Sequence, residues 1–400
     1  MDYSLTKQID ELYNTPFFIL HSDKFINNVK LFKYAFVHRN GKVIVCHSFK
    51  TNYVNRLCEL SKQMGCYAEV VSEFEYALAK HIGFSNIIVN GPIKAKSLIF
   101  DAIKDGHILV LNSEFEVSLI CQLKRENPNL AVKIGLRINL SPNDYQDFSR
   151  FGIPVVFLDQ IIKRLSDANV PIILLHSHIS DCLRQVEKFE YITHKLLDIA
   201  EHYCLDNVQY IDVGGGFGGA VPNGMTNNYP SYEDYANGIL KICFSNSWYM
   251  NHQPFIVIEP GVSVVANVFS YITKVYDKKM INNRVTVTVD GSCLDIKPSF
   301  HNKPLPFKII NQTDTLGQNE PETIDVVGST CLENDILLSR IKVKSIKLND
   351  YIQFDGVGAY TITMTPTFIN YLATILALEN GMIRIIRRRQ NLEDILRLYP

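Results

Sequence analysis

The sequence lacks the features that would place it in several broad classes of protein. Its 400 residues contain no apolar run of about eighteen or more, the length that a membrane-spanning helix needs. The formal net charge is only -1, which gives no overall field to attract nucleic acid or an anionic membrane. We therefore expect neither a nucleic acid nor a membrane as a partner.

The N-terminus and the cysteines both argue against export. The opening stretch, MDYSLTKQIDELYNTPFF, carries acidic residues early and has no apolar core of the kind found in an export signal. The nine cysteines are odd in number and form no CxxC pair, which is atypical of a disulfide framework or a zinc site. Together these absences predict a cytoplasmic protein with reduced thiols.

Up to about residue 255 the sequence alternates short apolar runs with segments of helical periodicity. The runs predicted as strands are VIVCHSF (43–49), AEVV (68–71), NIIVNG (86–91), HILVLN (107–112), VKIGLRIN (132–139), IILLHSHI (172–179), VQYIDVGGG (208–216) and FIVIEPG (255–261). The segments predicted as helices are 52–63, 73–82, 94–105, 114–125 and 185–204. Continuously apolar strands are typical of parallel strands covered on both faces. The pattern predicts an α/β fold with a (β/α)8 barrel, and a doubly wound open sheet is the alternative.

The pattern changes after about residue 268, where β-rich segments are separated by polar turns. These segments are 271–277, 284–290, 324–328, 340–343 and 351–355. Since no strong helix separates them, they predict a mostly antiparallel second domain. The apolar strand at 16–20 fits either domain by its pattern. We predict two domains, 22–268 for the barrel and 1–21 plus 269–400 for the β domain.

Reactive and small residues stand where the predicted barrel strands end. Lys50 follows the first strand, the run HSH occupies 176–178, DVGGG occupies 212–216, and EPG ends the last strand at 259–261. The active site of such a barrel lies at the C-terminal ends of its strands. These groups are therefore predicted to face one cavity.

Each of these groups also has a plain structural interpretation. Lys50 would reach water from a strand end, and the glycines would form a turn. His176 and His178 would share one strand face, where a metal site lacks a third ligand, so we predict no metal. Glu259 would cap a helix or pair with Arg137. Jointly, however, a buried lysine, free glycine N–H groups and a carboxylate are what pyridoxal phosphate needs for its aldehyde, its phosphate and its ring nitrogen.

The motifs resemble, in order along nearly the whole chain, those of the fold type III pyridoxal-phosphate decarboxylases of the ornithine, diaminopimelate and arginine group. The matching stretches are Thr15–Phe18, Phe49–Asn52, Glu69–Ser72 with Glu75, Arg137–Asn139, Ser149–Ile153, Leu175–His178, Asp212–Gly218, Glu259–Gly261, Val289–Gly291, Gly328–Cys331, Asn334–Asp335, Gly358–Thr361 and Ile385–Arg389. The resemblance implies pyridoxal phosphate as the cofactor, and a barrel joined to a mostly antiparallel β domain.

The resemblance also implies a role for each matched residue. Lys50 would hold the cofactor covalently, and Glu259 would be ionised and keep the ring nitrogen protonated. His178 would stack on the ring, while Cys331 from a partner subunit would return a proton to Cα, which implies a homodimer with shared sites. The further cofactor contacts that it implies are Glu69, Arg137, Ser180, Gly215, Gly216, Gly261 and Tyr360. The substrate contacts are Leu332, Glu333 and Tyr360.

Three positions depart from the family pattern. Val262 stands where the family has an arginine on the cofactor phosphate, so the sequence leaves open how that phosphate is held. After His178 the family has a small hydrophobe, Gly and Ser, whereas Ser180 and Asp181 stand at the last two places here, and we expect Ser180 to donate instead. Leu332 replaces the acid that follows the cysteine in enzymes for ornithine-like or diaminopimelate substrates.

These departures shape the predicted function. We predict a pyridoxal-phosphate-dependent carboxy-lyase that decarboxylates a larger or non-standard amino acid at its α-carboxylate, in the biosynthesis of a siderophore, an antibiotic or a modified peptide. The alternatives are a diaminopimelate decarboxylase of lysine biosynthesis and a catalytically altered regulatory homologue. An alanine-racemase-like enzyme would want an arginine at the ring nitrogen, and Glu259 argues against it.

Overall fold

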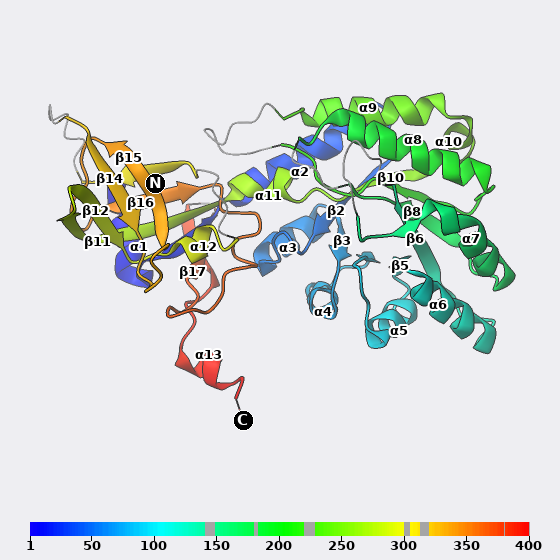
Figure 1. Ribbon diagram of the computed structural model, residues 1–400, viewed down its shortest axis with the longest axis horizontal. Coiled ribbons are helices and arrows are strands. Elements are labelled where there is room, and N and C mark those ends of the chain that lie inside the picture. The colour runs from blue at the N-terminus through cyan, green and yellow to red at the C-terminus, as the bar shows by residue number, and fades with distance from the viewer. Residues whose placement is uncertain are drawn as a thin grey trace. The chain divides into compact units, whose positions relative to one another are not determined.

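The chain folds into two compact units. The computed structural model describes residues 1–140, 149–179, 183–219, 229–299, 305–312, 320–379 and 381–399. One unit comprises Ile26–Gly219 and the described part of Asn228–Val264, and the other comprises Met1–Phe25 with the described part of Val265–Pro400. Figure 1 gives the order of the elements along the chain.

The first unit is built on eight parallel strands that close into a barrel. Each strand pairs with the next, and the last pairs with the first. In barrel order the strands are β2 (Val43–Ser48), β3 (Tyr67–Val70), β4 (Ile87–Val89), β5 (Ile108–Leu111), β6 (Lys133–Asn139), β8 (Ile172–His176), β9 (Tyr210–Asp212) and β10 (Phe255–Ile258). The short strand β7 (Ile153–Pro154) pairs with β6 beside this ring. The predicted barrel is confirmed, and the open sheet is wrong.

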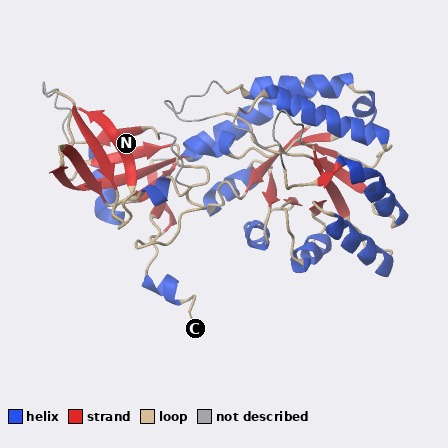
Figure 2. Ribbon diagram, viewed as in Figure 1, coloured by secondary structure: helices blue, strands red, loops and turns tan. Residues whose placement is uncertain are grey.

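Helices follow most of the barrel strands and lie outside the ring (Figure 2). They are α2 (Ser22–Val37), α3 (Asn55–Gln63), α4 (Glu73–Ile82), α5 (Lys96–Lys104), α6 (Glu114–Glu126), α7 (Leu158–Asp167), α8 (Val186–His202), α9 (Tyr232–Ser245), α10 (Ser247–His252) and α11 (Val262–Val265). Serine caps explain where two of them begin, because Ser72 and Ser113 accept hydrogen bonds from Glu75 N and Glu116 N. The five helical segments named from the sequence are all present, as α3, α4, α5, α6 and α8.

The second unit is a mostly antiparallel sheet with three short helices. Its strands are β1 (Phe17–Leu20), β11 (Phe269–Ile281), β12 (Arg284–Val289), β13 (Phe307–Ile310), β14 (Glu322–Val327), β15 (Ile336–Val343), β16 (Tyr351–Asp355), β17 (Thr374–Glu379) and β18 (Met382–Arg387). The helices are α1 (Tyr3–Tyr13), α12 (Cys293–Ile296) and α13 (Leu392–Leu396). Two of the strand pairs, β1 with β17 and β12 with β14, are parallel. The predicted mostly antiparallel domain is therefore confirmed, and it contains two parallel strand pairs.

The N-terminal strand β1, which the sequence left unassigned by its pattern, belongs to this second sheet. It lies between β11 and β17, with Phe17 opposite Ile272 and beside Thr374. Both of its faces are buried, and Phe17 and Ile19 join a core cluster with Ile272. Side chains on both faces are therefore covered by packed apolar groups, while the backbone is paired on both edges, as expected for a central strand.

The barrel interior is filled by apolar side chains from several strands. Cys46, Ile88, Val110, Leu174 and Val257 belong to one buried cluster. This packed core leaves the chemistry to the strand ends, as in other barrels of this type. Within the described residues, none of the helices has the length and hydropathy that a membrane span requires.

Candidate active site

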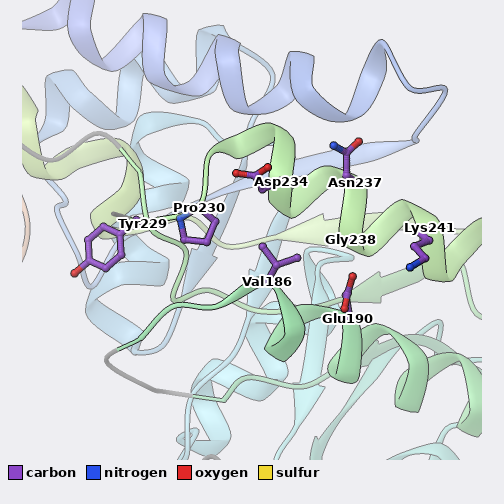
Figure 3. Close-up of a pocket in the computed structure, with 8 residues that line it drawn as sticks. All are labelled: Val186, Glu190, Tyr229, Pro230, Asp234, Asn237, Gly238 and Lys241. Carbon is purple, nitrogen blue, oxygen red and sulfur yellow. The ribbon is translucent and has the colours of Figure 1, made fainter. Parts of the chain in front are cut away.

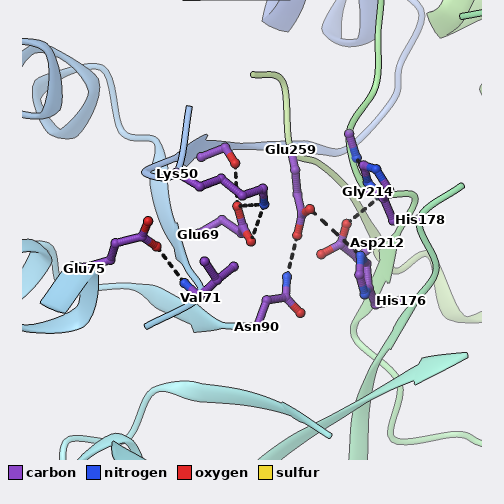
Figure 4. A network of polar contacts seen from close by, with 12 residues as sticks. Lys50, Glu69, Val71, Glu75, Asn90, His176, His178, Asp212, Gly214 and Glu259 are labelled. Atoms are coloured by element: carbon purple, nitrogen blue, oxygen red, sulfur yellow. Dashed lines mark hydrogen bonds and ion pairs between the residues drawn. The ribbon is translucent and has the colours of Figure 1, made fainter. Parts of the chain in front are cut away.

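Charged side chains from different strands meet at the C-terminal end of the barrel (Figure 4). Lys50 follows β2, Glu69 lies in β3, Asp212 is the last residue of β9, and Glu259 follows β10. Because all eight strands are parallel, their C-terminal ends open to the same side. The predicted convergence of Lys50, the histidines, the glycine run and Glu259 is confirmed.

Lys50 is held by Glu69 across two neighbouring strands. Its Nζ donates to Glu69 Oε1 at 2.8 Å and to Oε2 at 2.7 Å. Ser48 Oγ adds a 2.5 Å hydrogen bond to Glu69 Oε2. Glu69 is fully buried, but 36 % of the Lys50 side chain is exposed, so the prediction of a buried lysine is wrong. The exposed part leaves the amine accessible from the cavity side.

Glu259 is the most deeply placed acid of the site. Asn90 Nδ2 donates to its Oε1 at 2.7 Å, and His176 Nε2 lies 3.9 Å from its Oε2. Burial, followed by the charges of Asp212 and Glu69, raises the pKa of Glu259 well above its ordinary value. Without a cationic partner the carboxyl is therefore protonated, and the predicted ionised state requires a positive charge beside it.

Asp212 is a second buried acid next to Glu259. Its Oδ1 accepts a hydrogen bond from Gly214 N at 2.9 Å. Burial raises the pKa of Asp212 to about 7, although the Gly214 hydrogen bond and the contact with Glu259 act in the opposite direction. Two acids this close cannot both ionise cheaply in a dry site.

The two histidines do not share a strand face, contrary to the prediction. His176 ends β8 and is fully buried, whereas His178 lies beyond the strand and packs on the glycine run. His178 Nδ1 accepts a hydrogen bond from Gly215 N at 2.9 Å, which leaves the proton of a neutral imidazole on Nε2. Burial, above the effect of nearby cations, lowers the pKa of both residues well below the ordinary value, so both are neutral at pH 7.

Three glycines form a cradle that no side chain would fit. A Cβ on Gly214 would lie 2.8 Å from His178, and one on Gly215 would lie 2.5 Å from Glu259 O. Gly261 is held as tightly, because its Cβ would lie 2.5 Å from Thr51 Oγ1. Only glycine allows such approaches. Gly215 N already donates to His178, whereas Gly216 N and Gly261 N, the other predicted backbone donors to the phosphate, have no acceptor among the described residues.

The remaining predicted contacts are placed as follows. Arg137 lies on β6, with its guanidinium 4.7 Å from the centre of the Phe151 ring. Burial lowers the pKa of Arg137, while the charges of Glu259 and Glu69 act in the opposite direction. Ser180 lies outside the described residues.

Four predicted residues belong to the other unit. Cys331 and Glu333 are exposed, and Leu332 is half-buried. Tyr360 is 40 % exposed and has a positive φ of 54°. Because the two units are separate bodies here, the part that these residues play in the site is a matter of proposal.

Buried polar atoms without partners cluster at the same strand ends. They include Thr51 Oγ1, Asn90 Oδ1, Ser263 Oγ and both ring nitrogens of His176. Natural proteins rarely leave such atoms unsatisfied, except where a ligand or water supplies the partner. A flat polar group with an anionic arm and a ring nitrogen fits this set of donors and acceptors, so the residues present suit pyridoxal phosphate.

Three residues at the same strand ends also lie close enough together to bind a metal ion. One ligand atom each from His176, Asp212 and Glu259 lies within 4.8 Å of the others, and all three residues are buried. The sequence suggested only histidines as ligands, and the structure adds Asp212 from β9 and Glu259 after β10. That the protein uses no metal stays a prediction.

Sequence reasoning missed Asn90 and undervalued Asp212. Asn90 follows β4, and Asp212 ends β9 just before the glycine run. Each stands at a strand end, so the rule that pointed to Lys50 and Glu259 was the available signal. The same rule also points to the Asn90 amide and to the Asp212 carboxylate.

A separate groove of about 550 Å3 lies on the outside of the barrel between α8 and α9 (Figure 3). Glu190, Asp234 and Lys241 line it, and it contains none of the predicted site residues. Gly238 at its floor brings the two helices together, since a Cβ there would collide with Val186 Cγ1. We attribute the groove to the packing of α8 against α9 and assign it no chemical role.

The fold and the charged groups at its strand ends are those of a barrel enzyme whose site suits a phosphorylated pyridine cofactor. The family described as "Pyridoxal-dependent decarboxylase, pyridoxal binding domain" matches residues 22–266. The chain therefore belongs to the pyridoxal-phosphate-dependent decarboxylases, and it is a carboxy-lyase with pyridoxal phosphate as its cofactor. The cofactor and the reaction class predicted from the sequence are confirmed, and the reading as a non-catalytic regulatory homologue loses its ground.

Relatives with different substrates cover the chain from end to end. A diaminopimelate decarboxylase of Helicobacter pylori strain J99 is 28 % identical over 98 % of this chain and 97 % of its own. An L-glutamyl-[BtrI acyl-carrier protein] decarboxylase of Niallia circulans is 26 % identical over 99 % of this chain and 96 % of its own. The crystal structure of a point mutant of H. pylori diaminopimelate decarboxylase complexed with L-lysine superimposes with a TM-score of 0.85, at 25 % identity and 98 % coverage of both chains.

The raised pKa of Asp212 predicts a pH-dependent gain in stability on its removal. Ionising Asp212 in the folded protein is costly above pH 7, whereas the unfolded chain ionises near pH 4, so the cost is full at pH 8 and absent below pH 4. Asp212→Asn keeps the Gly214 hydrogen bond and cannot ionise. We expect cofactor-free Asp212→Asn to be about 1–3 kcal/mol more stable than the wild type at pH 8, with a smaller gain toward pH 5.

Urea melts of the two cofactor-free proteins between pH 5 and pH 8 measure this difference. Asp101→Asn is the control, because Asp101 lies exposed on α5 and its removal should show no such trend. A variant that is less stable than the wild type at every pH would contradict the assignment.

Proposed function

We propose that this enzyme removes the α-carboxylate of an amino acid whose distal end is neutral or acylated, in the biosynthesis of a specialised metabolite. The observation that carries the proposal is the segment around Cys331, where the buried acid, Asp335, already accepts hydrogen bonds from the fold and is not available to a distal ammonium. The relative from Niallia circulans supports it, since that enzyme is named for a glutamyl group carried on an acyl-carrier protein.

The acid nearest to this segment is fully engaged in the fold. Asp335 is only 3 % exposed, and its carboxylate accepts hydrogen bonds from Cys293 N at 2.7 Å and Thr330 Oγ1 at 2.6 Å. Ser292 Oγ and Thr330 N donate to it as well. A carboxylate with four donors has little capacity left for a substrate. Leu332 offers no charge, and Glu333 is exposed.

Diaminopimelate is the second candidate substrate, because relatives such as the Helicobacter pylori enzyme are named diaminopimelate decarboxylases. Its distal carboxylate would need cations near 297–305. Lys297 is turned inward, with Nζ 3.4 Å from Leu337 O, and burial lowers its pKa. Lys303 lies outside the described residues. An inward ammonium is a poor match for a carboxylate that arginine would clamp with two hydrogen bonds.

The barrel residues divide the chemistry among them. Pyridoxal phosphate supplies an electron sink for the pair left behind when CO2 departs. Lys50 Nζ provides the amine for covalent attachment, and Glu69 keeps that amine in place. Glu259 would hold the proton shared with the ring nitrogen, because its buried carboxylate needs a cationic partner when it is ionised. His178 would pack against the ring face, and Arg137 and Gly261 would complete the walls of the pocket.

We further propose that residues 22–268 act as the cofactor domain and that 1–21 with 269–400 act as the β domain of a cytoplasmic homodimer. In such a dimer Cys331 enters the partner's site and returns a proton to Cα, with Tyr360 as a contact for the phosphate and the substrate. The exposure of both side chains is compatible with a role at a subunit interface. Gly216 N and Ser180 would add phosphate contacts.

Covalent attachment can be tested directly. Borohydride reduction of the protein with its cofactor should fix a pyridoxyl group on Lys50, as detected by peptide mass spectrometry, and Lys50→Ala should lose the visible absorption. Lys94 is the internal control, because it lies near the end of another strand but is buried and pairs with Glu116 at 3.1 Å. Label on Lys94 or on another lysine would show that the assignment is wrong.

Shared sites predict recovery of activity by mixing inactive variants. Lys50→Ala and Cys331→Ala subunits should form hybrid dimers with one intact site each, giving about a quarter of wild-type activity after random exchange. A mixture of Lys50→Ala with Glu259→Gln is the control, since both changes lie in the same barrel and every site stays damaged. With subunit exchange proven by mass, an inactive first mixture would mean that each site is built within one chain.

The substrate proposal predicts poor activity on free diamino acids. An unpaired distal ammonium would cost about a thousandfold in kcat/KM, so ornithine and lysine should be weak substrates beside carrier-bound or side-chain-acylated amino acids. CO2 release across such a panel measures this. Leu332→Asp should improve ornithine turnover, whereas Glu333→Gln should leave it unchanged. A wild-type kcat/KM above about 10^4 per molar per second on ornithine or lysine would overturn the proposal, and the same value on diaminopimelate would establish the second candidate.

A further inference from the structure

A fully buried lysine lies beside the glycine cradle. Lys188 is 0 % exposed and stands in the first turn of α8. Its Nζ is 3.5 Å from Gly216 O, and a Cβ on Gly216 would lie 3.0 Å from the same nitrogen. Gly216 has a φ of +90°, which favours glycine, so the backbone leaves the ammonium in contact with the cradle.

Burial of the Lys188 ammonium has an electrostatic cost that its surroundings must offset, and one contribution is the Phe189 ring, whose centre lies 4.5 Å from Nζ. An ammonium loses its hydration when it is buried, and the oxygen atoms around it must replace that hydration. A cation in the first turn also opposes the positive end of the helix dipole. A site that holds an anion reverses both effects, because the anion gains from the lysine and from the dipole together.

Packing fixes Lys188 against the loop. The ring of its neighbour Phe189 stacks on Phe217 with centroids 4.0 Å apart. Tyr235 OH accepts a hydrogen bond from Gly218 N at 2.8 Å and donates to Arg184 O at 2.5 Å, which ties the loop to the start of α8. The ammonium is therefore held at one place relative to Gly216 rather than free to swing toward solvent.

We propose that Lys188 provides the cationic contact to the phosphate of pyridoxal phosphate, beside Gly216 N. This rests on the glycine cradle being the phosphate site. Val262, which follows the Glu259 motif, carries no donor in its side chain, so the charge comes from α8 instead of from the loop after β10. Lys188 also lowers the pKa of His178, which places its charge within electrostatic reach of the residue assigned to the cofactor ring.

Comparing two ligands on one variant isolates the phosphate contact. Lys188→Met removes the charge and keeps the apolar stem, while Lys195→Met is the control on the same helix, with a side chain that is 45 % exposed. Dissociation constants are measured by the visible spectrum for pyridoxal phosphate and for pyridoxal, which lacks the phosphate. Lys188→Met should weaken the binding of pyridoxal phosphate about 10- to 100-fold and leave the binding of pyridoxal nearly unchanged. Lys195→Met should alter neither dissociation constant.

The alternatives give different results. If Lys188 has only a structural role, Lys188→Met weakens both ligands equally or neither, and the proposal fails. Lys188→Arg keeps the charge and should retain most of the preference for the phosphorylated ligand. Should Lys188→Met not fold, Lys188→Gln and Lys188→Arg carry the same comparison. Borohydride labelling of Lys50 in the wild type tests the cofactor site separately, so a failure there is distinguishable from a failure of Lys188.

Discussion

Closure of the barrel by pairing of β10 with β2 is the constraint on which the site depends. It brings Glu259, at the end of the last strand, close to Asp212 on one side and to the strand ends of β2 and β3 on the other. The three acids Glu69, Asp212 and Glu259 then lie close together, and burial together with the charge of Glu69 raises the pKa of Asp212 and of Glu259. Folding the cofactor-free barrel therefore stores electrostatic cost at one end.

That cost has a chemical use. A buried acid with a raised pKa can give its proton to a pyridine nitrogen and become a stabilised anion beside the cation it has created. The neutral histidines fit the same picture, since a charged imidazole next to the ring would compete for Glu259. Lys50 is treated differently, because Glu69 neutralises it while part of its side chain stays exposed. The accessible amine of Lys50 is thus kept apart from the buried Glu259 and histidines, whose protonation states are set by their surroundings.

In the function that we propose, substrate choice depends on a different segment of the chain. Asp335 anchors the turn that carries Cys331 and Leu332, and Gly328 allows this, because a Cβ there would collide with Asp335 Oδ2. The turn is thus built from its own acid, and the position after the cysteine is free to vary without loss of the anchor. Such an arrangement explains how one scaffold serves relatives that act on diaminopimelate and on a carrier-bound glutamyl group.

The sequence by itself determined the eight strands, their parallel order and the residues at their ends, because continuous apolar runs and punctuating glycines are local signals. It also carried Lys50, Glu259 and the glycine run as one chemical set. It did not determine that His178 leaves its strand, that β1 is central in the second sheet, or that Asn90 bonds Glu259, since each depends on which segments become neighbours across long stretches of chain. Protonation states and the placement of Lys188 beside Gly216 were decided only by the tertiary structure, because burial and distance set the energy of a charge, and neither is written in the local sequence.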